Sequence, residues 1–229
     1  MRLCLCLVAL VGVCLCIIET FETEHWYDTW KVETRQVGGP PPMSGSIPLS
    51  PSVAERERDG ASGSQGWFDP ADIIIIGSHG YPISYDDHCK YESSDNTAVM
   101  PHGTHFMSDL TDWHGNTTLS YETSWTNSEG EGVMQFEYEL HFVPHGKWFG
   151  VGQYLGDIYI KPTILWCKHN YHTDIHVTFP ADPVNRGSTS DPIAGIEIQM
   201  TIENSYKSNS SGAYSYSWWL QGDGVWKPM

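Results

Sequence analysis

Histidine is the residue type best placed to do chemistry in this chain, because imidazole binds transition metals and transfers protons near neutral pH. The densest group places His172, Asp174 and His176 two residues apart, and His102 and His105 form a second pair. We take these five residues as candidate ligands of a divalent metal. No spacing among them defines a complete set of ligands, so solvated side chains on a polar strand are the simpler interpretation.

The conformation of residues 172–176 decides how these side chains could share a metal. On a strand, His172 and His176 would stand about 13.6 Å apart, at about 3.4 Å per residue. Zinc–nitrogen bonds of about 2.1 Å cannot join two groups at that distance. Asp174 lies two residues from each histidine and on the same face, so only these neighbouring pairs could share an ion.

Glu137, Glu139 and His141 form a second weak candidate, this time for catalysis. They occupy alternate positions and would share one face of a strand. If that strand lay beside residues 172–176, carboxylates and imidazoles would meet on one sheet face, as glycoside cleavage requires of its paired carboxylates. The alternative is an ordinary wet outer face of a sheet.

Recognised catalytic motifs do not occur in the sequence. It contains no Gly-x-Ser-x-Gly nucleophile turn, no His-Glu-x-x-His zinc helix, no phosphate-binding loop and no dinucleotide fingerprint. We therefore expect a protein that is not an enzyme and that needs no cofactor, with a divalent metal as the one candidate.

Aromatic side chains are candidate ligand contacts. Trp219 follows Trp218 and would point away from the core, while Trp148 and Trp226 lie next to glycine-rich turns. An exposed aromatic ring can stack on a sugar or enter a membrane interface. The residues expected to share the core face near the C-terminus are Tyr214, Tyr216 and Trp218.

Alternating apolar and polar residues predict the elements that must position these groups. Between Val133 and Val143, Met, Phe, Tyr, Leu and Phe alternate with Gln, Glu, Glu and His. This period of two is typical of a strand with one buried face. Six further segments are expected to be strands: 72–76, 119–126, 158–166, 172–179, 196–203 and 214–220. Pro162 predicts an edge or a bulge within the third of them.

Strands with one polar face belong to antiparallel sheets, because the strands of parallel sheets are buried on both sides. No segment of the body shows a helical period, and turn residues separate nearly all the strands. The sequence therefore predicts an all-β fold, an antiparallel β-sandwich that is jelly-roll-like. A closed β-barrel is the alternative.

The N-terminus predicts export. Arg2 precedes an uncharged apolar run that ends at Ile18, as in a signal peptide, so we assign residues 1–18 to one and expect a secreted, extracellular protein. A membrane anchor is the alternative. Residues 19–37 form a short stub, which is either an edge strand or a flexible leader.

Residues 38–66 interrupt the chain. Gly, Pro and Ser make up 17 of these 29 residues, a composition that cannot offset its ordering entropy by burying apolar surface. We expect a disordered linker or a pro-segment, with cleavage after Arg58 as one route to its removal. The β-sandwich domain is assigned to residues 67–229.

Export has two covalent consequences. Of six Cys, only Cys89 and Cys167 remain after the signal, and an oxidising compartment favours a bridge between them over two free thiols. Asn116 and Asn209 begin Asn-x-Ser/Thr sequons in polar surroundings, which predicts glycosylation at both.

Net charge limits the partners. The chain carries 28 acidic and 12 basic residues, a net charge of −16, so nucleic acid is excluded and contact with anionic membranes is disfavoured. The leading hypothesis is a secreted protein that recognises glycan or extracellular-matrix surfaces. A hydrolase or lyase, with or without a metal, is the alternative, and a pore-forming or toxin-like protein is the third.

Overall fold

The computed structural model describes residues 22–27, 30–40, 69–77, 80–84, 96–206 and 210–229. The predicted signal peptide, nearly all of the linker, Cys89 and Asn209 lie outside these ranges. None of the described segments forms a helix long and apolar enough to cross a bilayer.

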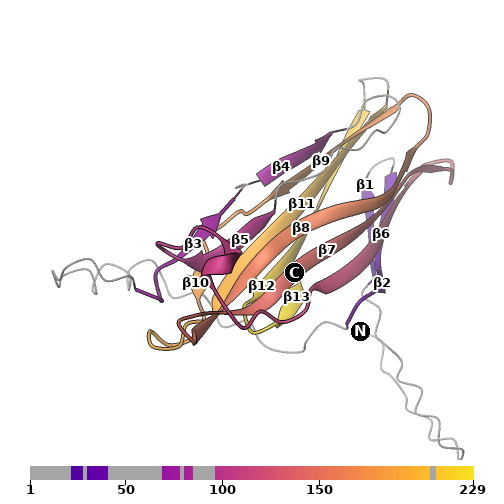
Figure 1. The fold of residues 1–229 in the computed structure, drawn as a ribbon. Helices are drawn as coiled ribbons and strands as arrows, with labels where there is room; N and C mark the ends of the chain where they lie inside the picture. The colour runs from indigo at the N-terminus through magenta and orange to yellow at the C-terminus, as the bar shows by residue number, and fades with distance from the viewer. Residues whose placement is uncertain (1–21, 28–29, 41–68, 78–79, 85–95, 207–209) are drawn as a thin grey trace, which may run out of the picture.

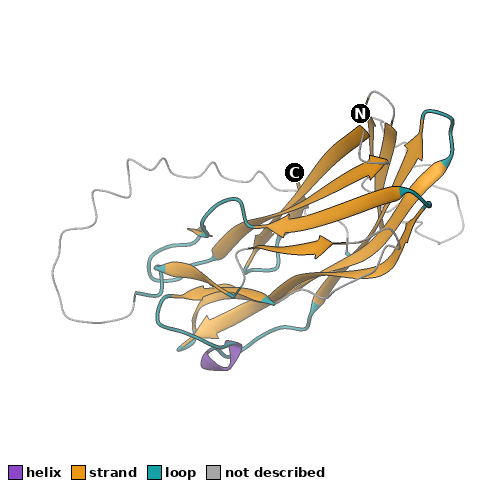
Figure 2. Cartoon of the chain, turned by 90° about the horizontal axis from the view of Figure 1, so that it is seen from above, coloured by secondary structure: helices purple, strands orange, loops and turns teal. Residues whose placement is uncertain are grey.

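Two antiparallel sheets make up the fold (Figures 1 and 2). The order of strands in the seven-stranded sheet is β1 (Glu22–Tyr27), β2 (Trp30–Gly38), β6 (Thr117–Asn127), β7 (Gly132–Trp148), β8 (Val151–Cys167), β5 (Thr97–Pro101) and β3 (Ile73–Ile76). The order in the second sheet is β13 (Trp226–Pro228), β12 (Ser210–Gln221), β11 (Ala194–Tyr206), β9 (Tyr171–Thr178) and β4 (Gly80–Ser84), with β10 (Val184–Asn185) paired to β11.

The predicted all-β sandwich is confirmed, and neither sheet closes on itself. Alternation explains the longest strands: Met134, Phe136, Tyr138 and Leu140 of β7 are buried, while the residues between them are only partly covered. Each of the seven predicted strands is present. The one helical turn among the described residues, η1 (Met107–Asp109), lies at one end of the sandwich (Figure 2).

Pro162 produces the predicted irregularity. Tyr138 pairs with Pro162 but Glu137 pairs with Ile164, so one residue of β8 bulges out of the ladder. The bulge accommodates a residue that has no N–H to donate.

The stub before the linker is part of the sandwich, so the domain is not confined to residues 67–229. β2 pairs along β6 from Trp30–Asn127 to Gly38–Ser120, and β1 forms the sheet edge outside it. Val32 is fully buried, and the Thr34 and Thr123 hydroxyls lie 3.0 Å apart.

Aromatic rings fill the space between the sheets. Tyr121 of β6 stacks against Tyr138 of β7 at 5.5 Å and meets the edge of Trp218 of β12 at 5.4 Å. Tyr214, Tyr216 and Trp218 share this core face, as predicted. Burial raises the pKa of the Tyr121 and Tyr138 phenols, which stay neutral.

Cys167 is the last residue of β8, and its Sγ lies 3.4 Å from the hydroxyl of Thr173. Because Cys89 is outside the described residues, the Cys89–Cys167 bridge stays a prediction.

Candidate functional site

The five candidate metal ligands do not come together. His172 and Asp174 are neighbours on the outer face of β9, with Nε2 3.2 Å from Oδ2. His102 and His105 follow β5 in the other sheet, and His102 Nδ1 lies 3.9 Å from Asp72 Oδ2. Within the described ranges, no three His, Cys, Asp or Glu side chains are arranged to hold a metal ion.

The proposed shared face of two strands is wrong. Glu137, Glu139 and His141 are on β7, which belongs to the opposite sheet from β9. On this face of β7, neighbouring side chains are hydrogen-bonded to each other instead. Gln135 donates to Glu137 at 2.9 Å, and Glu139 lies 2.9 Å from His141 Nε2.

His141 has a structural role in this face of the sheet. Its side chain is buried, its ring stacks on Tyr159 at 4.6 Å, and its Nδ1 lies 3.0 Å from Asn116 Nδ2 and 3.1 Å from the Thr118 hydroxyl. The imidazole therefore fixes the start of β6 to β7, and both of its nitrogens are engaged.

The three candidate tryptophans have different environments. Trp226 is buried in the core. Trp219 does point away from Trp218, but its expected exposure is wrong because the Arg186 guanidinium covers the ring at 4.8 Å. Burial argues against direct ligand contact by either. Trp148 is partly buried at the end of β7.

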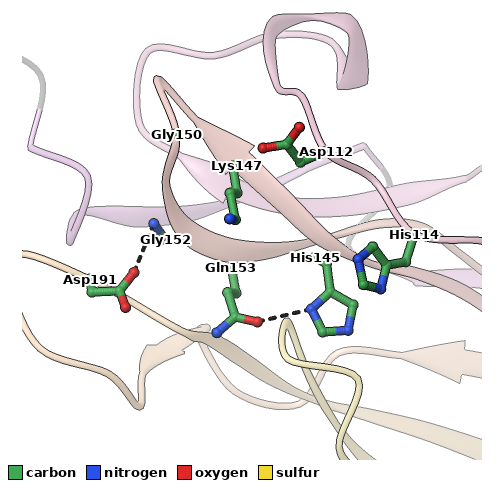
Figure 3. A pocket seen from close by; sticks show the side chains of 8 residues that line it. All are labelled: Asp112, His114, His145, Lys147, Gly150, Gly152, Gln153 and Asp191. Carbon is green, nitrogen blue, oxygen red and sulfur yellow. Dashed lines mark hydrogen bonds between the residues drawn. The ribbon is translucent and has the colours of Figure 1, made fainter.

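A polar pocket lies where the β7–β8 hairpin turns (Figure 3). We call it the hairpin pocket. Its volume is about 730 Å³. Its lining residues are Asp112, His114, His145, Lys147, Gly150, Gly152, Gln153 and Asp191.

Four segments build the hairpin pocket side by side. Residues 111–114 run along β7, joined by two hydrogen bonds of 2.8 Å between Thr111 and Lys147. On the other side of the pocket, the segment before β11 lies against β8. The N–H of Gln153 donates a 2.8 Å hydrogen bond to Pro192 O. Residues far apart in sequence are thereby placed around one space.

Two hydrogen bonds orient the pocket side chains. Gln153 Oε1 lies 2.9 Å from His145 Nδ1, so the amide oxygen accepts the imidazole proton at that nitrogen. The ring of His114 packs against the same imidazole at a tilt of 39°, with the ring centroids 4.0 Å apart. Across Gln153, Asp191 Oδ1 accepts the N–H of Gly152 at 3.1 Å (Figure 3).

The backbone around the pocket is strained. Asp112, His145 and Phe149 have φ values of 61°, 68° and 50°, which makes them three of the five described non-glycine residues with positive φ. Side chains in this region cost about 1–3 kcal/mol each and concentrate at functional sites. The β7–β8 hairpin and the segment beside it therefore hold most of the strained non-glycine backbone among the described residues.

Glycines let segments approach closely here. A Cβ on Gly146 would overlap the ring of Trp113, which packs on the β7 backbone and donates its indole N–H to Met107 O at 3.0 Å. A Cβ on Gly222 would overlap the Gln153 carbonyl, on which the β12–β13 turn rests. Both contacts fix neighbours of the pocket.

Sequence reasoning drew attention to the turn next to this site, where Trp148 lies, but it predicted none of the residues that line the pocket. Residues 145–150, with glycines at two positions and an aromatic pair between them, carried a turn signal. The partners at Asp112, His114 and Asp191 have no sequence spacing that connects them to this turn, because only tertiary pairing brings them together.

Comparison of the chain with models of protein families, with curated proteins and with solved structures found no match.

Proposed function

We propose that this protein is a secreted recognition protein that binds a glycan of a cell or matrix surface in the hairpin pocket. The observation that carries the proposal is the gathering of carboxylates, an amide, an ammonium and imidazoles around one open space of about 730 Å³. That volume falls in the range of small-ligand sites, about 300–1,000 Å³.

The chemistry of the lining suits sugar hydroxyls, each of which both donates and accepts a hydrogen bond. Asp112 and Asp191 offer acceptors, Lys147 offers donors, and Gln153 and the histidines offer both. Glycines at positions 150 and 152 leave room for a ring to approach the backbone.

Secretion and glycosylation complete the proposal. Asn116 is exposed, and it lies two residues after His114 of the pocket. An N-glycan on this residue would mark the same side of the molecule as extracellular surface.

Hydrolysis is the second candidate, supported by one observation. Because Gln153 Oε1 accepts the proton at His145 Nδ1, the lone pair at Nε2 of neutral His145 is the basic one, as in a general base. The same pocket holds Asp112 and His114, which could transfer a second proton.

Binding of the secreted, glycosylated chain to a printed array of neutral, sialylated and sulfated oligosaccharides tests the proposal. We expect binding that Gln153→Ala and Asp112→Asn weaken about tenfold or more, while the control Glu137→Gln on the outer face of β7 leaves it unchanged. Absence of binding, or equal loss in the control, would overturn the proposal. Release of sugar from an array ligand, abolished by His145→Asn, would support the hydrolase instead.

A further inference from the structure

Phe149 is the most exposed large apolar side chain among the described residues, with 87% of its surface accessible. It sits at the tip of the β7–β8 hairpin, between Trp148 and Gly150. Its neighbour Gly150 lines the hairpin pocket.

The turn that carries Phe149 is unfavourable for its side chain. Trp148 pairs with Val151, which leaves Phe149 and Gly150 as a two-residue connection with φ values of 50° and 79°. Both positive values are those of a type I′ turn, which favours Asn-Gly because most side chains are strained there. An exposed phenylalanine that costs folding free energy and packs on no core requires another reason to be there.

The rest of the tip is anchored. Trp148 packs against the core, and its ring lies 5.1 Å from that of Phe149. Thr111 pairs with Lys147 just behind it. The turn that carries the phenyl ring is thus already ordered before a ligand binds, which keeps the entropy cost of a stacking contact low.

We propose that Phe149 is a stacking platform for one ring of a neutral oligosaccharide whose neighbouring ring lies in the hairpin pocket. The inference rests on the proposed function and names its ligand class. The C–H face of a pyranose is apolar and covers a flat aromatic ring, while its hydroxyls turn toward the polar lining.

Charge selects a neutral ligand over an acidic one. Two carboxylates, Asp112 and Asp191, face a single ammonium, Lys147, in the pocket, and the whole chain carries a net charge of −16. Sulfated and sialylated oligosaccharides would be repelled by the carboxylates of the pocket and, at longer distance, by the net charge of the whole chain.

Phe149→Asn separates the platform from a structural role. Asparagine suits the turn, so we expect the Tm to rise by about 2–4 °C. Affinity for the neutral oligosaccharide bound on the array falls about tenfold in the same variant, and Phe149→Trp restores it. The control is Trp166→Ser, which removes a half-exposed ring about 50 Å along β8, at about 3.3 Å per residue, and leaves affinity unchanged.

The outcomes distinguish the two proposals. If Gln153→Ala abolishes binding but Phe149→Asn retains it, the platform is overturned and the pocket stands. If the wild-type chain binds only sialylated or sulfated oligosaccharides, the platform for a neutral ligand is overturned and the proposed function stands. If it binds no oligosaccharide of the array, both fail. Co-sedimentation with phosphatidylcholine vesicles that Phe149→Asn removes would overturn the platform by showing that the ring enters a bilayer.

Discussion

Strand β7 contains two regions that obey different rules. From Val133 to Phe142, buried and partly covered residues alternate almost without interruption, and the pairing with β6 is continuous from Trp125 to Thr117. From Val143 to Trp148, the ladder to β8 slips repeatedly: three of the four register shifts between these strands fall between His141 and Trp148. The first region carries the core and the second borders the hairpin pocket.

The two regions differ in how far their local features agree with one another. In the first region, hydrophobic period, strand pairing and burial agree, which is the condition for a stable fold. In the second, His145 adopts a left-handed conformation and Gly146 leaves room for the ring of Trp113. Strained backbone clusters at functional sites, so this irregularity agrees with the glycan site that we propose there.

A substitution in the regular region should destabilise the fold most. Phe136→Ala removes a fully buried ring that stacks on Tyr138 at 4.8 Å, and it should lower the free energy of unfolding by about 3–5 kcal/mol. Chemical denaturation followed by tryptophan fluorescence measures the loss. A change below about 1 kcal/mol would mean that the core of the first region is not packed as described.

In the irregular region, Gly146→Ala should cost about 1–3 kcal/mol, because its methyl group displaces the Trp113 ring and with it residues 111–114. Glycan binding should weaken in parallel. The matched control is Gly132→Ala at the start of the same strand, where a Cβ would meet nothing within 4 Å. Equal destabilisation by both substitutions would show that Trp113 does not depend on Gly146.

Gln153→Ala should destabilise the fold by only about 0.5–1.5 kcal/mol, since it removes the single hydrogen bond to His145. The side chain of His145 should then lose its fixed tautomer, which ¹⁵N chemical shifts of the imidazole report. An unchanged tautomer would show that Gln153 is not what orients this ring.

Acid should change the structure of the loop around Asp109 only slightly. The N–H groups of His105 and Phe106 donate to Asp109 Oδ2 at 2.8 and 3.0 Å and lower the pKa of Asp109 below its ordinary value of about 3.9. The carboxylate therefore stabilises the loop above that ordinary value, and this contribution is lost as the pH falls through the lowered pKa. Amide shifts of both residues should titrate together in acid, and Asp109→Asn should abolish that titration.

The regular region was predictable because its information is local. The alternation of apolar and polar residues alone predicts Phe136 in the core and Glu137 outside it. Pro162 by itself predicts the bulge in β8, because proline has no N–H to donate to the ladder. Strand partners depend on contacts between distant segments, which is why the sequence left open whether β7 and β9 are neighbours, and the structure places them in different sheets.

The site was predictable only at its turn. Arg186 covers Trp219 across two strands of the second sheet, and no property of residues 218–226 predicts that contact. Asp191 reaches Gly152 from a segment 39 residues away, so its role emerges only from the assembled fold.

The pairing of β2 with β6 changes the meaning of a cut in the connecting segment. Cleavage after Arg58 would not release the N-terminal piece, because its hydrogen-bond ladder and the buried Val32 side chain hold it to the sheet. The processed protein would be a non-covalent heterodimer of a short and a long chain derived from one gene product. Its two parts would travel as one species under native conditions and separate only on unfolding.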